Sequence, residues 1–261
     1  MTAWALVFDP WLGSRILARN GLIYYKRTKV PLHTASQLAE IPTRARRLER
    51  YFLVGNPAVV MNDEKYFTFT DAEDPSIDGY YTSYRSLCPT DVKYKPKTKF
   101  PKKVLVWLAI SDAGISDALV IRRSSVSIDQ HSYLREFIKK SLMKFINEHH
   151  SDGHYIFRLA SCNYAKKVVD WMDAAGIKYV PKTANQPNCP QARPIENFWS
   201  ILASKVYSDG WTAKTYLQLI RRINFCLRNI DSQLVKRLMA SVRSKVRQLY
   251  TNGPLSERLI N

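Results

Sequence analysis

Residues 180–199 read VPKTANQPNCPQARPIENFW, a loop rich in proline and asparagine that leads into the start of a predicted helix over 195–207. Four prolines lie within 181–194 and keep that loop out of regular structure. Glu196 falls in the first turn of the helix, where an acid complements the helix macrodipole. That structural role is the alternative against which any chemical role for Glu196 must be weighed.

Two further stretches accompany this loop. The first is Asn62-Asp63-Glu64-Lys65-Tyr66-Phe67, inside a strand predicted over 58–70 because the segment is rich in Val, Phe and Tyr. The second is residues 159–167, LASCNYAKK, after a short predicted strand over 155–159. Asp63 alone would fit a turn or sheet-edge carboxylate. Glu64 should point to the opposite strand face and is interpreted as structural.

The order of predicted elements indicates an α/β fold with a mixed sheet covered by helices. The predicted strands lie over 58–70, 80–84, 104–110, 118–122, 155–159 and 178–180. The predicted helices lie over 14–20, 35–52 (interrupted by Pro42), 129–148, 163–174, 195–207, 212–228 and 231–250. We expect three parts: an N-terminal remnant and basic linker over 1–52, the α/β domain over 53–210 and a helical extension over 211–261.

The three quoted stretches resemble mariner-type transposases of the DDE class, over roughly residues 13–250. The resemblance implies an RNase H-like fold, with residues 14–31 as the tail of a helix-turn-helix DNA-binding region. It also implies DNA transposition and integration by phosphodiester strand transfer, acting on transposon ends and target DNA. A homodimer bound to two ends is a further expectation from the family.

The chemistry of the family explains its carboxylates. Two divalent ions about 3.5–4 Å apart stabilise the attacking and leaving oxygens of an in-line displacement, and Mg²⁺ prefers oxygen ligands. By resemblance, Asp63 is the carboxylate that bridges the two ions and Glu196 is the third ligand. An active protein would use Mg²⁺ or Mn²⁺, whereas a degenerate one would bind none.

The sequence departs from the family at the second carboxylate, which we place at Arg158. A guanidinium cannot ligate Mg²⁺, and we expect Arg158 to pair with Asp63 or Glu196 in place of a metal. Asn163 stands where a histidine commonly follows. Asp152 and Asp170 are the conceivable substitutes for the missing acid, but neither is well placed.

The charge balance indicates a polyanionic partner. The chain has 261 residues with 40 Lys+Arg against 22 Asp+Glu, a net charge of +18, and 46% of its residues are hydrophobic, enough for a sizeable core. DNA is the first candidate, and a merely soluble or ribosome-associated basic protein is the alternative. The basic residues chosen as DNA contacts are Arg15, Arg19, Lys26, Arg27, Lys29, Lys93, Lys95, Lys97, Lys99 and Arg193.

The remaining signals are weaker. Four cysteines form no CxxC pair and read as isolated thiols. No apolar run is long enough to span a membrane, so no membrane partner is expected, and a DNA-binding protein points to the nucleus. Three functions compete: a degenerate DNA-binding transposase derivative, an active transposase with a rearranged carboxylate set, and a domesticated non-enzymatic DNA-binding module.

Overall fold

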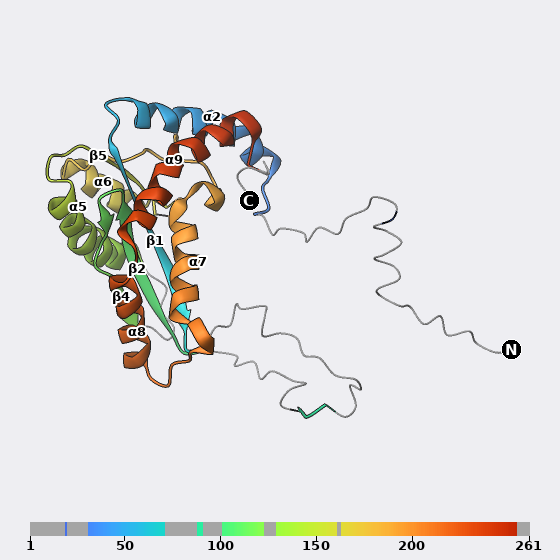
Figure 1. Cartoon of the computed structure of the whole chain (residues 1–261). Helices are drawn as coiled ribbons and strands as arrows, with labels where there is room; N and C mark the ends of the chain where they lie inside the picture. The colour runs from blue at the N-terminus through green and yellow to red at the C-terminus, as the bar shows by residue number, and fades with distance from the viewer. Residues whose placement is uncertain are drawn as a thin grey trace.

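A mixed five-stranded sheet with helices on both faces forms the body of the protein (Figure 1). The structure, a computed structural model, describes residues 19, 31–70, 88–90, 101–122, 129–160 and 163–254. Its strands are β1 (Ala58–Thr68), β2 (Lys103–Ser111), β3 (Gly114–Ile115), β4 (Leu119–Arg122) and β5 (Tyr155–Arg158). Its helices are α2 (Ala35–Leu53), α4 (Gln130–Ser132), η3 (Tyr133–Leu142), α5 (Met143–His149), α6 (Lys166–Ala174), η4 (Pro190–Ala192), α7 (Pro194–Val206), η5 (Ser208–Gly210), α8 (Tyr216–Arg228) and α9 (Ser232–Asn252).

The sheet places the long strand β1 between an antiparallel and a parallel neighbour. β1 pairs with β2 antiparallel, with Asp63 opposite Leu108, and with β5 parallel, with Met61 opposite Arg158. β3 and β4 pair with β2 on its other side. The apolar run 104–110 is buried along its whole length, as expected for a strand covered on both faces.

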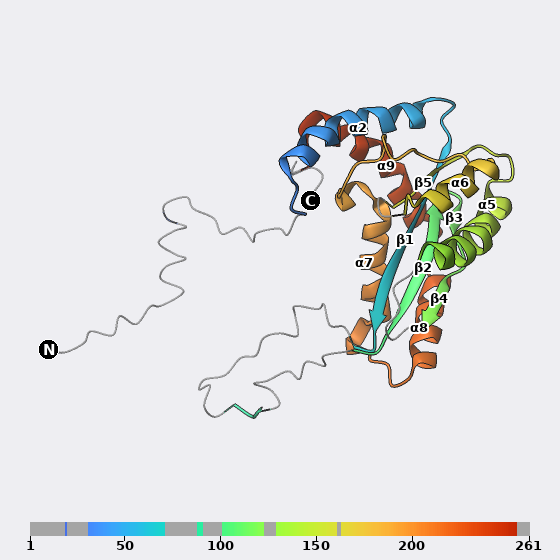
Figure 2. The ribbon, with the colours of Figure 1, turned by 180° about the vertical axis from the view of Figure 1, so that it is seen from behind.

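The two faces of the sheet bury separate apolar cores, because successive side chains of a strand point to opposite faces. Val59 and Met61 face the core shared with α2, α7, α8 and α9. Val60 and Trp107 face the core shared with η3, α5 and α6. The two opposed views show these helix layers on either side of the strands (Figure 2). The predicted α/β class with a mixed sheet flanked by helices is confirmed.

The helix α2 is continuous, whereas the sequence predicted an interruption at Pro42. Thr34 caps its start in a capping box with Gln37, and Pro42 lies inside the helix. An interior proline costs about 3 kcal/mol, through one lost hydrogen bond and a clash of its ring with the carbonyl one turn earlier. Burial of the apolar stripe Ile41, Ala45, Leu48 and Phe52 against the core offsets that cost.

Most other elements lie where the sequence placed them. Asp129 caps the helix that begins at Gln130, as predicted, and its central turns (η3) have π-helical winding. The segment predicted as a strand over 178–180 makes one parallel bridge, between Phe157 and Tyr179. The predicted strand over 80–84 lies outside the described residues, as does the predicted helix over 14–20 except for Arg19. No helix in the described part of the chain is long and apolar enough to cross a membrane.

The boundaries at 52/53 and 210/211 stay predictions. The helix α2 lies along α9, and both contribute to the core that also holds β1. The first described helix and the last one therefore pack together on the same face of the sheet (Figure 1).

Candidate active site

Asp63 lies on β1 on the face that looks toward α7. It follows Val59 and Met61 at alternate positions, so its carboxylate points to the same side of the sheet as theirs. Trp199 Nε1 donates a hydrogen bond to Asp63 Oδ2 at 3.0 Å. One carboxylate oxygen of Asp63 is therefore already engaged by a side chain of α7.

Glu196 lies one turn before Trp199 on the same helix. Pro194 begins α7, and the Glu196 amide donates to the carbonyl oxygen of Arg193 at 3.0 Å. The two acids Asp63 and Glu196 line one cavity of about 400 Å³, whose wall also contains Glu64, Lys65, Tyr66, Asn197, Trp199 and Ser200. The structure thus brings together the two acids that the sequence singled out from positions far apart in the chain.

Burial and mutual repulsion act on these acids. Burial raises the pKa of Glu196 above its ordinary value, and the charge of Asp63 raises it further. Burial also raises the pKa of Asp63, against the lowering effect of Arg193. Both carboxylates therefore lie in a setting where a cation would be stabilising.

Arg158 does not pair with either acid, so that expectation is wrong. Its side chain is fully buried, and it donates to Asn185 Oδ1 at 3.2 Å, to the Ala192 carbonyl at 3.0 Å and to Gln186 Oε1 at 2.9 Å. Burial lowers the pKa of Arg158 to about 9, and the nearby charge of Arg193 adds to that effect. Arg158 anchors the loop 185–192 with neutral acceptors instead of neutralising a carboxylate.

The strand register explains the error. Arg158 lies beside Met61, and Asp63 lies two residues further along β1. The ladder with β5 ends at this pair, and the Arg193 guanidinium bonds to the Asn62 and Leu159 carbonyls just beyond it. The side chain of Arg158 turns to the loop 185–192, and the position of the second carboxylate stays a prediction.

The guanidinium that stabilises this site belongs to Arg193. Its Nη2 donates to the Asn62 carbonyl at 2.7 Å and its Nη1 to the Leu159 carbonyl at 3.2 Å, which ties β1 to the chain that follows β5. Its charge lowers the pKa of Asp63, Glu64 and Glu196 alike. Arg193 is buried, so its position does not support the phosphate contact that the sequence predicted for it.

Glu64 alternates with Asp63 along β1 and pairs with Trp107, yet it also lines the edge of the same cavity, so it is more than a structural residue. Burial raises its pKa to about 7, and the charge of Asp63 adds to the shift. A hydrogen bond with Asn163 acts in the opposite direction. Asn163 and Asn62 each donate to the Tyr133 hydroxyl at 2.7 Å, so this side of the strand carries a small polar cluster.

The acids of this cavity match a two-metal centre only in part. The Trp199 hydrogen bond takes one lone pair of Asp63 Oδ2 and leaves the other oxygen open. Arg193 already supplies positive charge near these acids. Asp152 accepts from the His154 amide, and neither Asp152 nor Asp170 lines the cavity. Over the described residues no group of three His, Cys, Asp or Glu side chains is arranged to hold a metal ion.

Most of the predicted DNA contacts cannot be placed. Arg19 is described as a single exposed helical residue. Outside the described residues lie Arg15, Lys26, Arg27, Lys29, Lys93, Lys95, Lys97 and Lys99. These assignments stay predictions.

Sequence reasoning missed three features of the site: the neutralising role of Arg193, the donor role of Trp199 and the raised pKa of Glu64. Two of these features could have been predicted from the sequence. Trp199 follows Glu196 by three residues, so both share one face of the helix. Arg193 directly precedes the proline that begins α7, and the residue before a proline is held extended (φ −117°, ψ 99°) at the entry to the helix.

Comparison with known proteins gives matches among solved structures. No family model and no curated protein matches the sequence. A Mos1 transposase paired-end complex with the left transposon end matches with a TM-score of 0.74 at 14% identity, covering 94% of this chain and 70% of that one. The Mos1 mariner paired-end complex with Mn matches with a TM-score of 0.75 at 14% identity, over 94% and 71%. The catalytic domain of Mos1 mariner transposase matches with a TM-score of 0.63 at 11% identity, over 87% of this chain and 98% of that one. The chain therefore has the RNase H-like fold of the mariner transposase catalytic domain.

Proposed function

We propose that this protein is a transposase-derived DNA-binding protein of the mariner type that has lost two-metal strand transfer. The carrying observation is the environment of Asp63: Trp199 bonded to one oxygen, the buried Arg193 nearby, and no group of three His, Cys, Asp or Glu side chains arranged for a metal over the described residues. The fold, and the fact that Asp63 and Glu196 line one cavity, support an origin from a transposase. The neighbours of this fold include complexes with transposon-end DNA, which supports DNA as the partner.

The position of Arg193 explains how the two carboxylates remain compatible with a stable fold in the absence of catalysis. Two carboxylates that repel one another in a partly buried cavity would destabilise the fold without a neighbouring cation. Arg193 meets that need from within the chain, and its guanidinium cannot accept electron pairs from a phosphate oxygen or a water as a divalent ion does. What remains is a cavity whose acids are stabilised by a cation of the chain itself.

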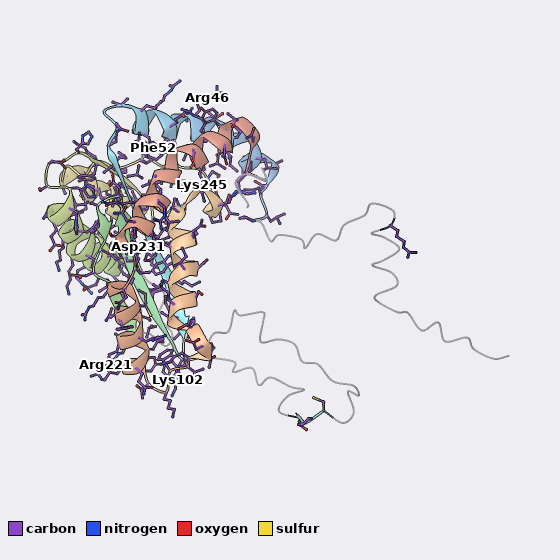
Figure 3. The ribbon with its side chains drawn as sticks, in the orientation of Figure 1. Arg46, Phe52, Lys102, Arg221, Asp231 and Lys245 are labelled. Atoms are coloured by element: carbon purple, nitrogen blue, oxygen red, sulfur yellow. The ribbon has the colours of Figure 1, made fainter. Side chains whose placement is uncertain are left out.

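Positive charge on the helical layer supports DNA binding. From 211 to 254 the chain carries nine basic residues and one acid, Asp231. In Figure 3, Arg221 lies at the lower end of the molecule and Lys245 on α9 in its upper half, so these basic residues spread along the helices. Such a surface holds phosphates without reading sequence. A nuclear location and pairing of two copies on DNA belong to the same proposal.

A nicking and strand-transfer assay tests the loss of chemistry. Purified protein is incubated with end-containing and nicked duplexes in Mn²⁺ and in Mg²⁺, beside the Asp63→Ala variant. We expect no cleavage or joining above the Asp63→Ala background, together with retained duplex binding. Cleavage by the wild type that Asp63→Ala abolishes would overturn the proposal.

An active enzyme with a rearranged carboxylate set is the second candidate, and one observation favours it. Glu64 lines the same cavity as Asp63 and Glu196 and has a pKa of about 7, so it could exchange a proton near neutral pH. Glu64→Gln decides between the two. If the wild type cleaves and Glu64→Gln does not, the rearranged set is correct.

A further inference from the structure

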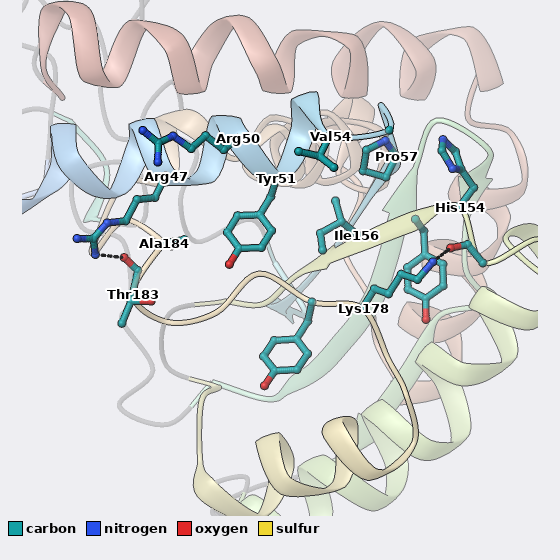
Figure 4. Close-up of a pocket in the computed structure, with 14 residues that line it drawn as sticks. Arg47, Arg50, Tyr51, Val54, Pro57, His154, Ile156, Lys178, Thr183 and Ala184 are labelled. Atoms are coloured by element: carbon teal, nitrogen blue, oxygen red, sulfur yellow. Dashed lines mark hydrogen bonds between the residues drawn. The ribbon is translucent and has the colours of Figure 1, made fainter.

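A second and larger cavity lies between α2, the start of β5 and the segment 178–184 (Figure 4). Its volume is about 900 Å³. The wall residues that bear on a ligand are Arg47, Arg50, Tyr51, Val54, Ile156 and Lys178. Ile156 pairs with Val59, and Asp63 lies four residues further along β1, about 13 Å away at about 3.3 Å per residue. The cavity is therefore separate from the carboxylate site.

The rim of this cavity is positively charged and has no carboxylate within it. Of the described residues in its wall, Arg47, Arg50 and Lys178 are cationic and none is acidic. Arg47 Nη1 donates to the Thr183 carbonyl at 3.4 Å and Lys178 Nζ to the Gly153 carbonyl at 2.6 Å. Neutral carbonyls orient these two cations without cancelling their charge, so both remain able to attract an anion.

The interior is apolar and aromatic. Tyr51 projects from α2 into the cavity beside Ile156, and its side chain stays 40% exposed (Figure 4). Val54, at 77% exposure, extends the same apolar surface. An accessible ring beside several unneutralised cations matches a ligand that has both a flat π-face and a phosphate.

We propose that this cavity binds a segment of single-stranded DNA, with a base against the Tyr51 ring and flanking phosphates at Arg47, Arg50 and Lys178. Its volume suits a base and its sugar and excludes a double helix. The net charge of +18 favours a polyanion over a neutral ligand, and the ring adds stacking that a simple anion would not use. The inference rests on the proposed function only in taking DNA as the polymer.

Binding of a labelled short oligothymidylate, followed by fluorescence anisotropy, tests the base contact. We expect Tyr51→Leu to weaken binding about tenfold, because one stacked base is lost. Trp171→Leu is the matched control, since Trp171 is a partly exposed aromatic residue on α6, outside the cavity wall and away from the basic helices α8 and α9. Equal affinity of Tyr51→Leu and Trp171→Leu would overturn the proposal.

Two further binding measurements distinguish the contribution of the base from that of the phosphates. An abasic oligonucleotide of the same length should bind the wild type about as weakly as oligothymidylate binds Tyr51→Leu. Arg50→Gln should weaken both ligands, whereas Arg135→Gln, which removes an exposed charge on η3, should weaken neither appreciably. Abasic binding as tight as that of oligothymidylate would show that the cavity holds no base.

Photo-crosslinking locates the contact directly. An oligonucleotide with 5-iodouracil is irradiated with the whole protein, and the crosslinked peptide is identified by mass spectrometry. A crosslink in the peptide that contains Tyr51 supports the proposal, and crosslinks confined to α8 and α9 contradict it. Failure of the wild type to bind duplex DNA in parallel would refute the proposed function, an outcome independent of these comparisons.

Discussion

Arg193 balances the charge of the carboxylate cavity from a buried position, and its replacement should destabilise the fold. Arg193→Gln removes a guanidinium whose two terminal nitrogens donate to the Asn62 and Leu159 carbonyls. Charge-assisted hydrogen bonds contribute about 1.5–3 kcal/mol each, and buried carbonyls left unpaired add a desolvation cost. We expect the free energy of unfolding in urea to fall by about 3 kcal/mol.

The control for this variant is Arg237→Gln on α9, whose side chain is 67% exposed. That change should alter the free energy of unfolding by less than about 0.5 kcal/mol, as exposed sites usually do. If Arg193→Gln proves as stable as Arg237→Gln, Arg193 does not hold the site together.

Glu64 should make stability depend on pH. Its ordinary pKa of 4.5 rises to about 7 in the folded protein, so the folded state binds more protons than the unfolded state between those values. Stability supplied by the protonated carboxyl is therefore complete below the unfolded pKa and is lost as pH rises through the folded pKa. The loss should be on the order of 3 kcal/mol between about pH 4.5 and pH 7.5.

The measurement compares wild type with Glu64→Gln, whose amide keeps the shape and stays neutral. The variant should lose less stability than the wild type between about pH 5 and pH 8. Comparison within this pair cancels other titrating groups, including His150, whose pKa is lowered by burial. Identical pH profiles for the two proteins would show that Glu64 titrates normally.

Among the secondary-structure elements, the register between β1 and β5 decides where a second carboxylate could act. Asp63 and Ala160 each lie two residues past the last pair of the ladder, Met61 with Arg158. We therefore expect Ala160→Asp to bring an acid toward Asp63, whereas Arg158→Asp should place one in the loop 185–192. In an Arg193→Asn background, we therefore expect Mn²⁺ to raise the melting temperature of Ala160→Asp and not that of Arg158→Asp. A ligand at 100 times its Kd stabilises by about 2.7 kcal/mol, which is easily measured by thermal unfolding.

The variant Arg158→Asp also supplies a control for folding. It removes the donors for Asn185, Gln186 and Ala192, so it should unfold at a lower temperature with or without Mn²⁺. Stabilisation of Arg158→Asp by Mn²⁺, with no response from Ala160→Asp, would show that the register argument is wrong.

The sequence predicted the elements better than their contacts. The apolar run 104–110 and the apolar stripe of 35–52 are local patterns that can be read from the sequence. Both segments form the predicted element and bury these residues in the core. The meeting of Asp63 and Glu196 was predicted through the family resemblance. The partner of Arg158 was not, because it depends on the register between two strands almost a hundred residues apart and on the path of a loop that contains four prolines within 181–194.

For the whole molecule, the packing of α2 on α9 and the distribution of charge are the features that bear on DNA. The core under β1 holds buried residues of both helices, so the first and last described helices stabilise one another. The opposite layer carries Arg135, Lys140 and Lys144, which pair with Glu136, Asp117 or Glu148. Between 211 and 254, Arg237 pairs with Asp231 and Arg247 with Glu49, whereas the other seven basic residues form no ion pair within the described residues. Unneutralised charge is therefore concentrated on α8 and α9.

This asymmetry predicts which face holds duplex DNA, and the salt dependence of binding can measure it. For the wild type, log K should fall linearly with log salt concentration, with a slope of about −0.9 for each phosphate that is neutralised. The double variant Arg221→Gln/Lys236→Gln removes exposed charges from α8 and α9 and should make the slope shallower by about 2. Lys139→Gln/Lys140→Gln removes the same charge from η3 on the opposite layer, where Lys140 is already paired with Glu136, and should leave the slope nearly unchanged.

If the η3 variant changes the slope and the α8/α9 variant does not, duplex DNA lies against the η3 layer and the charge argument fails. If the wild-type affinity is flat across the salt range, phosphate contacts do not drive binding and the DNA-binding proposal fails with it.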